Sequence, residues 1–295
     1  MTGPADSSAP AGAAKFSHRA MDTVFTLMAR GADAALAAGA AAAVFARIDE
    51  LERLLTRFSD SSDVAVVRGL APGRTAVVAR ETMDLLVESA RACAATRGAF
   101  DPTVKCRNFG DLVLDPDHCR VAVRNRVELD FGGIGKGFAL DECARILAGE
   151  QFGLDDWLLD AGTSTIRASA PAGGSWPLGV GGRWKRRTRR ETVAELSSGA
   201  LSGSGFEIQG AHVFDPRTGR PATRWAQSWA FAPTGAMADA LSTAALALAP
   251  SELRAACAAL GARVLVAREQ PRALDFLRDP LAAFGDWPAP TGERA

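Results

Sequence analysis

The sequence lacks paired cysteines. Its five cysteines are odd in number and scattered, and no two of them form a CxxC pair. This distribution argues against both a disulfide framework and a thiolate zinc site. Cys93, Cys143 and Cys257 stand in apolar helical patterns, where a small buried hydrophobic side chain is the simplest interpretation. A reducing compartment fits this usage best.

Net charge is also missing, because 34 basic residues balance 34 acidic ones. Nothing in the overall charge draws the protein to nucleic acid or to an anionic membrane. The basic run at 185–190, with Trp184 beside it, is an alternative nucleic-acid contact, but a solvated loop explains it more simply. We therefore expect no nucleic-acid partner.

Long apolar segments are absent too. No stretch approaches the roughly eighteen uninterrupted apolar residues of a membrane span, so no span is expected. The amino terminus has neither the basic nor the Leu-rich region of a signal peptide. We therefore expect a cytoplasmic protein, or a periplasmic one if a leader was removed.

The composition that remains, 47% apolar and 23% charged, is typical of a soluble globular protein. Helices are predicted at 33–58, 80–96, from after Gly137 to about 147, and at 236–249, and strands at 25–28, 127–131, 157–159, 165–168 and 263–267, with a hairpin between 178–180 and 192–196. These elements alternate without a steady βαβ order, which predicts the α+β class. Residues 1–17 are expected to be a flexible segment, residues 18–278 the folded domain, and residues 279–295 a loose tail.

Asp239 and Thr243 are candidate metal ligands. Four residues apart on a helix, they project from one face with Cβ atoms roughly 5–6 Å apart. A carboxylate with a hydroxyl suits Mg²⁺, which keeps several waters and takes further oxygens from substrate phosphates. Taken alone, the pair has an ordinary explanation, in which Asp239 lies near a helix start and Thr243 packs. Its neighbours in the sequence favour the metal site.

His212 is the candidate base. It is one of only three histidines, and Asp215-Pro216 follows it as a turn that Thr218-Gly219 completes. An imidazole titrates near neutral pH, so it is suited to removing a proton from a hydroxyl nucleophile.

A glycine cluster at 132–137 lies between a predicted strand and a predicted helix. Its backbone N–H groups and the charge of Lys136 would favour a phosphate. The spacing is neither GxGxxG nor GxxxxGK[ST], so the cluster alone is a weak signal, and the glycines could serve only close packing. The turn at 98–103 likewise has an ordinary explanation, as a proline turn with a core phenylalanine.

The order of these motifs resembles one family, the ApbE-like FAD:protein FMN transferases, also called flavin transferases. The resemblance runs in order from about residue 21 to residue 267, and the last two motifs are the most specific. The matching segments are Met21-Asp22-Thr23 (Met-Gly-Thr in the family), Leu55-Thr56-Arg57-Phe58, Gly98-Ala99-Phe100-Asp101-Pro102-Thr103-Val104 (GAFDPTV), 129–141 (DLGGIAKGYAVD), Ser202-Gly203-Ser204-Gly205, 212–219 (HIIDPRTG) and 238–244 (ADALSTA).

The resemblance implies a two-lobed α+β fold, with mixed or antiparallel sheets flanked by helices and FAD between the lobes. It also implies a reaction, in which Mg²⁺-dependent cleavage of FAD transfers FMN to a Thr or Ser hydroxyl of an acceptor flavoprotein and releases AMP. Mg²⁺ would be held by Asp239, Thr243 and the carbonyl of Gly133, and His212 would be the base. The FAD site would be lined by Met21, Phe58, Ala99, Phe100, Asp101, Asp130, Lys136 and Val213.

Several positions depart from the family's pattern. Its glycine after Met is Asp22, its asparagine is Arg68, and its tyrosine after Lys-Gly is Phe138, in a chain without any tyrosine. Its GGD-like turn reads Gly162-Thr163-Ser164-Thr165. The metal and base positions are kept, so the transferase is the leading hypothesis. An FAD pyrophosphatase giving FMN and AMP, and an FAD-binding protein without turnover, are the alternatives.

Overall fold

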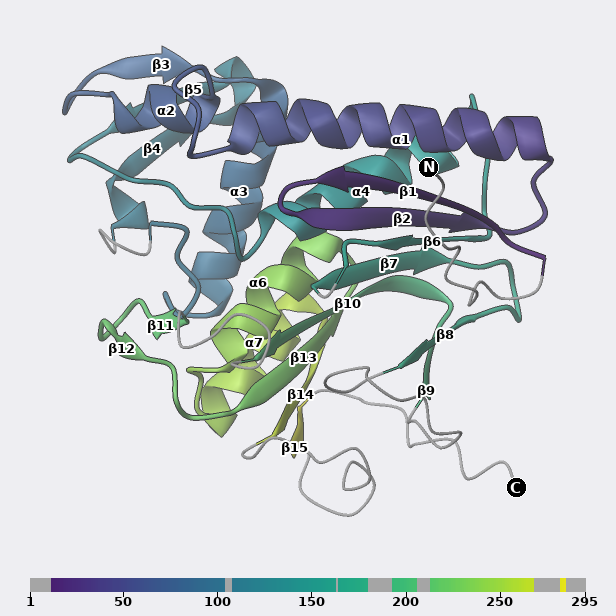
Figure 1. Cartoon of the computed structure of the whole chain (residues 1–295). Helices are drawn as coiled ribbons and strands as arrows, with labels where there is room; N and C mark the ends of the chain where they lie inside the picture. Colours follow the sequence, from purple (N-terminus) through teal and green to yellow (C-terminus); the bar gives the residue numbers. More distant parts are fainter. Residues whose placement is uncertain are drawn as a thin grey trace.

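The computed structural model describes residues 12–103, 108–162, 164–179, 193–205, 213–267 and 282–284. Its centre is an eight-stranded sheet in the order β1-β2-β6-β7-β10-β13-β14-β15, in which every neighbouring pair is antiparallel (Figure 1). The strands are β1 (Ala14–Ala20), β2 (Thr23–Ala29), β6 (Trp157–Asp160), β7 (Thr165–Ser169), β10 (Ser198–Gly205), β13 (Gln227–Ala232), β14 (Arg263–Ala267) and β15 (Ala282–Phe284). The predicted α+β class, with antiparallel sheet and flanking helices, is confirmed.

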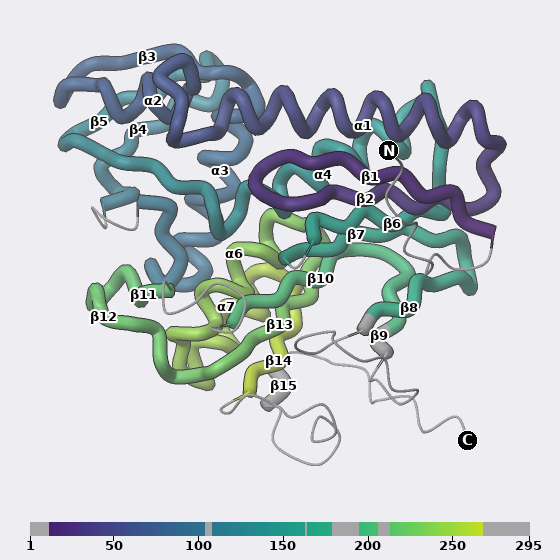
Figure 2. The backbone as a smooth tube through the Cα atoms, viewed as in Figure 1, coloured from purple at the N-terminus to yellow at the C-terminus, as the bar shows by residue number. Residues whose placement is uncertain are grey.

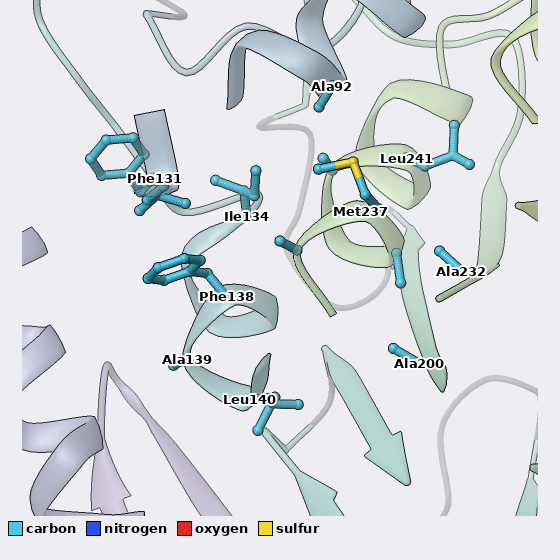
Figure 3. Close-up of a cluster of buried hydrophobic side chains, with 14 of the residues drawn as sticks. Ala92, Phe131, Ile134, Phe138, Ala139, Leu140, Ala200, Ala232, Met237 and Leu241 are labelled. Carbon is cyan, nitrogen blue, oxygen red and sulfur yellow. The ribbon is translucent and has the colours of Figure 1, made fainter. Parts of the chain in front are cut away.

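Helices cover one face of this sheet (Figure 1). They are α1 (Ala34–Leu55), α4 (Gly135–Ala148), α6 (Gly235–Ala245) and α7 (Pro250–Leu260), and α3 (Arg80–Ala95) packs behind α6 and α7. Helix α6 packs against β10 and β13, and α4 packs against α6, so these two helices form the centre of the core. Ile134, Phe138 and Met237 are fully buried there, and Figure 3 shows them around the starts of α4 and α6.

The other face of the sheet carries a second, smaller apolar cluster. The hairpin of β8 (Trp176–Gly179) and β9 (Val193–Leu196) contributes to it, and its pairing confirms the predicted hairpin. Trp176 is buried there, with the Arg30 guanidinium 3.6 Å above its ring centroid.

A small sheet lies at one end of α1, as the backbone trace in Figure 2 shows. It has the order β3-β5-β4 and was not predicted. Its strands are β3 (Thr75–Val77), β4 (Leu112–Asp115) and β5 (Arg120–Val123). The same part of the chain includes the short helices α2 (Asp63–Arg68), η1 (Phe109–Asp111) and η2 (Pro116–His118). No described helix is both long and apolar enough to cross a bilayer.

One strand prediction is wrong, and both terminal segments differ from the expected ones, since β15 pairs with β14 within the expected loose tail, 279–295. Residues 127–131 form no strand, although Val127, Leu129 and Phe131 are buried, because no neighbouring strand pairs with them there. The alternating apolar residues of this segment therefore indicate burial of one face, not pairing within a sheet. The expected flexible segment, 1–17, includes the start of β1, which pairs with β2 from Ala14 onward, and residues 1–11 lie outside the described part.

Candidate functional site

Asp239 is a buried carboxylate on the second turn of α6, with only 2% of its surface exposed. The Gly137 N–H, in the first turn of α4, donates to Oδ2 at 3.1 Å. The hydroxyls of Ser164 and Ser202 both lie 3.3 Å from Oδ1. Thr234 caps α6 by accepting the N–H of Met237, so this helix begins at a fixed place.

Among the described residues, the hydrogen-bond donors to the Asp239 carboxylate are all neutral groups. Within the described residues, no lysine, arginine or histidine forms an ion pair with this carboxylate. A buried anion is costly unless a cation compensates it. The charge of Asp239 is therefore suited to an added cation.

Thr243 lies one turn further along α6. Its hydroxyl donates to the Asp239 carbonyl at 3.2 Å, and this leaves the oxygen lone pairs for another partner. Gly133 lies beside it, since a Cβ on Gly133 would be 3.3 Å from the Thr243 Oγ1 and 3.6 Å from the Phe100 ring. The structure thus brings Gly133 next to the helix that carries Asp239 and Thr243.

A shell of serine hydroxyls surrounds these oxygens. Ser202 and Ser204 are two residues apart on β10, so both face α6, and their Oγ atoms lie 3.1 and 2.9 Å from that of Ser242. Ser204 is also 3.4 Å from Thr243. The sequence reasoning gave these serines no role. The Ser-x-Ser spacing before the histidine was the available signal, together with Ser164 in the turn before β7.

The glycine turn before α4 is held by Asp130. Its Oδ1 accepts the Gly132 N–H at 2.9 Å, and its Oδ2 pairs with Arg57 at 2.9 Å. The Arg57 guanidinium lies 4.8 Å from the Phe58 ring centroid, and Phe58 is 85% exposed. The Lys136 ammonium donates to the Gly132 carbonyl at 3.4 Å. Phe58, Asp130 and Lys136 are therefore connected through this turn, and Phe58 is free to contact a ligand.

The turn at 98–103 is shaped by its own hydrogen bonds and is joined to the next motif, because the Asp130 N–H donates to the Pro102 carbonyl at 2.7 Å. Oδ1 of Asp101 accepts both the N–H and the hydroxyl of Thr103, at 2.7 and 2.6 Å. Ala99 and Phe100 are buried, and the Phe100 N–H donates to the Thr96 hydroxyl at 3.0 Å. Asp101 thus shapes the turn, and the Phe100 ring reaches Gly133.

Two of the departures from the family's pattern, Asp22 and Arg68, have clear structural consequences. Met21 and Asp22 form the two-residue loop between β1 and β2, and both have positive φ, 47° and 58°. The Met21 N–H donates to Glu52 of α1 at 2.9 Å, which holds this conformation. Arg68 pairs with Asp60 at 3.1 Å and donates to the Arg57 carbonyl at 3.4 Å, so it ties down the loop that presents the exposed aromatic side chain.

His212, the candidate base, lies outside the described residues. The turn that follows it is described and has the predicted form. The Asp215 carboxylate accepts the backbone N–H and the guanidinium of Arg217, and the Gly219 N–H donates to the Asp215 carbonyl at 2.8 Å. The Val213 carbonyl accepts the Ala222 N–H at 3.0 Å, which closes the loop.

This turn is joined to α7. Arg217 also pairs with Glu252 at 2.6 Å. Burial raises the pKa of Glu252, but the hydrogen bond from the Ala249 N–H and the Arg217 guanidinium together outweigh it and lower the pKa. A Cβ on Gly98 would lie 3.8 Å from the Arg217 side chain, so two of the motifs found in the sequence meet in space.

No group of three or more His, Cys, Asp or Glu side chains suited to a metal gathers among the described residues. The donor set here is instead one carboxylate with neutral oxygens. Such a set fits Mg²⁺, because this ion takes one or two carboxylates and completes its shell with water and phosphate oxygens.

Comparisons with known proteins cover the same part of the chain as the motifs. The family model described as ApbE family matches residues 21–108 and 105–266. The chain belongs to the ApbE family. It is 25% identical to the FAD:protein FMN transferase of Klebsiella pneumoniae (strain 342), over 92% of this chain and 86% of that protein. It is 28% identical to that of Treponema pallidum (strain Nichols), over 70% of each.

Solved structures of ApbE proteins share the fold. The flavin transferase ApbE from Vibrio cholerae superposes with a TM-score of 0.73 at 19% identity, covering 87% of this chain and 94% of that one. The ApbE protein from Thermotoga maritima superposes with a TM-score of 0.70 at 22% identity, covering 86% and 94%.

Proposed function

We propose that this ApbE protein is a Mg²⁺-dependent FAD:protein FMN transferase. It would transfer FMN from FAD to a Thr or Ser hydroxyl of an acceptor flavoprotein and release AMP. The observation that carries this proposal is the buried Asp239 carboxylate, which has only neutral described partners and lies one turn from Thr243, the residue beside Gly133. The names of the relatives support the same activity.

The oxygen atoms gathered around Asp239 support a set of three metal ligands. Mg²⁺ would be held by the Asp239 carboxylate, the Thr243 hydroxyl and the Gly133 carbonyl. When bound, it would neutralise charge on the FAD diphosphate, which is most of what phosphoryl transfer requires. The Ser164 and Ser202 hydroxyls orient the carboxylate by donating to Oδ1.

The remaining residues bind and orient the dinucleotide. Lys136 would place a positive charge beside the diphosphate, and the exposed Phe58 ring would stack on an aromatic part of FAD. The rest of the proposed FAD site is Met21, Ala99, Phe100, Asp101, Asp130 and Val213. Asp101 and Asp130 would act by shaping their turns, as their hydrogen bonds within these turns support.

Transfer of FMN to the acceptor hydroxyl requires one base, which takes the hydroxyl proton. The acceptor hydroxyl oxygen forms a bond to the FMN phosphorus while the bond from that phosphorus to the AMP oxygen breaks. The hydroxyl proton passes to His212, which we propose as the base from its place before Val213 and the fixed turn at 215–219.

The test is incubation with FAD, Mg²⁺ and an acceptor flavoprotein, followed by mass spectrometry of the acceptor and assay of AMP. We expect FMN on an acceptor Thr or Ser, with AMP released in equal amount. In Asp239→Asn, which keeps the side-chain shape, both products should fall by at least about 100-fold, the loss typical of one strong electrostatic group. AMP formed without acceptor would instead indicate a pyrophosphatase, and intact bound FAD a non-catalytic binder. Unchanged labelling by Asp239→Asn would contradict the metal assignment.

A further inference from the structure

Helices α4 and α6 cap each other at their first turns. The Gly137 N–H of α4 donates to Asp239 of α6, at 3.1 Å. In return, the N–H groups of Gly235 and Ala236, at the start of α6, donate to the two carboxylate oxygens of Asp141 on α4, at 2.7 and 2.9 Å. Each aspartate follows its own helix's glycine by four residues, so the two helices exchange equivalent bonds.

The two aspartates differ in how their charge is balanced. Asp141, 6% exposed, pairs with Arg167 of β7 at 3.1 Å. The same guanidinium donates at 2.8 Å to the carbonyl of Pro233, just before α6. Burial raises the pKa of Asp141, and Arg167 and the two N–H donors oppose this rise. Asp239 has no such described cation, so the protein neutralises one carboxylate of the pair and leaves the other for a ligand.

The contact between the helices leaves little room for adjustment. A Cβ on Gly137 would overlap the Gly235 carbonyl, and a Cβ on Gly235 would overlap the Gly137 carbonyl. One helical turn separates the backbone N–H groups held by Asp141 from the Asp239 side chain. A shift at the start of α6 would therefore move the Asp239 and Thr243 oxygens directly.

We propose that Asp141 is a positioning residue for the cation site, because it fixes the first turn of α6 and thereby the ligand oxygens of Asp239 and Thr243. This inference rests on the proposed function. Arg167 acts with it by holding both Asp141 and the chain before α6.

Loss of a group that orients a metal ligand costs about 10- to 100-fold in metal affinity. Asp141→Ala should therefore raise the dissociation constant for Mn²⁺, used as a spectroscopic substitute for Mg²⁺, by about this factor. Asp141→Asn keeps one oxygen for one of the two N–H groups, so its loss should be smaller.

The experiment titrates the full chain with Mn²⁺, without FAD, and follows bound metal by electron paramagnetic resonance and calorimetry well below the unfolding temperature. The variants are Asp141→Ala, Asp141→Asn, Asp239→Asn and Asp33→Ala, and each is also unfolded thermally. Asp33→Ala is the matched control because Asp33 caps α1 by accepting the Leu36 N–H at 2.8 Å, at the far end of the helical layer from the site. It should lower the melting temperature and leave Mn²⁺ affinity unchanged.

The expected order of Mn²⁺ affinity is wild type and Asp33→Ala, then Asp141→Asn, then Asp141→Ala, with Asp239→Asn weakest. If Asp141→Ala melts earlier but binds Mn²⁺ like the wild type, Asp141 is only a helix cap and the inference fails while the proposed function stands. If Asp141→Ala does not fold, Asp141→Asn decides in the same way. If Asp239→Asn binds as well as the wild type, the metal assignment and the inference fail together.

Discussion

At the scale of single residues, one buried and one partly buried carboxylate of this chain illustrate two kinds of environment. Asp239 is surrounded by neutral donors, which stabilise its negative charge and leave room for a cation. Asp160, at the end of β6, is partly exposed as a residue, but its Oδ1 atom is buried and has no hydrogen-bond partner among the described residues. Burial raises the pKa of the Asp160 carboxyl to about 7, against the opposing effect of the Gly162 N–H and of Lys15.

The raised pKa of Asp160 predicts how the free energy of unfolding depends on pH. Below the ordinary value of 3.8, both the folded and the unfolded state hold the Asp160 proton. As the pH rises toward 7, the unfolded state loses the proton first, so the folded state loses stability over this window. Asp160→Asn cannot ionise. It should therefore unfold like the wild type near pH 3.5 and be more stable near pH 8, by on the order of 2–4 kcal/mol.

Urea unfolding of both proteins across this pH range measures the difference. A wild type whose stability relative to Asp160→Asn stays constant from pH 3.5 to pH 8 would show that Asp160 ionises normally in the folded state.

At the scale of elements, the first turns of α4 and α6 approach each other closely. Gly137 and Gly235 allow it because neither carries a Cβ. The same contact brings the Gly137 N–H to Asp239. The glycines between 132 and 137, which as a sequence pattern were a weak phosphate signal, therefore have a packing role at Gly137 and the proposed ligand role at Gly133.

Gly137→Ala should test this packing. The added methyl group meets the Gly235 backbone, which has no flexible end to move aside, so we expect a loss of about 2–3 kcal/mol in the free energy of unfolding. Gly110→Ala is the control because nothing lies within 4 Å of its Cβ. Equal unfolding midpoints in urea for the two variants would contradict the close approach of the helices.

The sequence predicted helices better than strands, for physical reasons. The apolar stripes of α1 and α3 repeat over several turns and identify these helices, whereas β10 reads Ser198-Gly-Ala-Leu-Ser-Gly-Ser-Gly205. Small residues have low strand propensity, yet they let β10 lie close to α6. Its serines could be assigned to the site only once the strand was placed against the helix.

At the scale of the whole molecule, the fold brings distant segments to one place. Gly133, Ser164, Ser202 and Asp239 come from four separate parts of the chain, joined by the order of the sheet and the packing of α4 against α6. The motifs indicated Gly133, Asp239 and Thr243 as candidate ligands, and the Asp239–Thr243 spacing predicted a shared helix face. The Arg167–Asp141 pair joins residues that are far apart in sequence and had no local pattern to reveal it.

The central claim is that the buried Asp239 carboxylate, Thr243 and Gly133 hold a divalent cation. A crystal of the protein soaked with Mn²⁺, with data collected for anomalous scattering, tests it most directly. We predict one strong anomalous peak at metal–oxygen bonding distance from Asp239 and Thr243, which is lost in Asp239→Asn. A peak at another site only, or an equal peak in Asp239→Asn, would contradict the account.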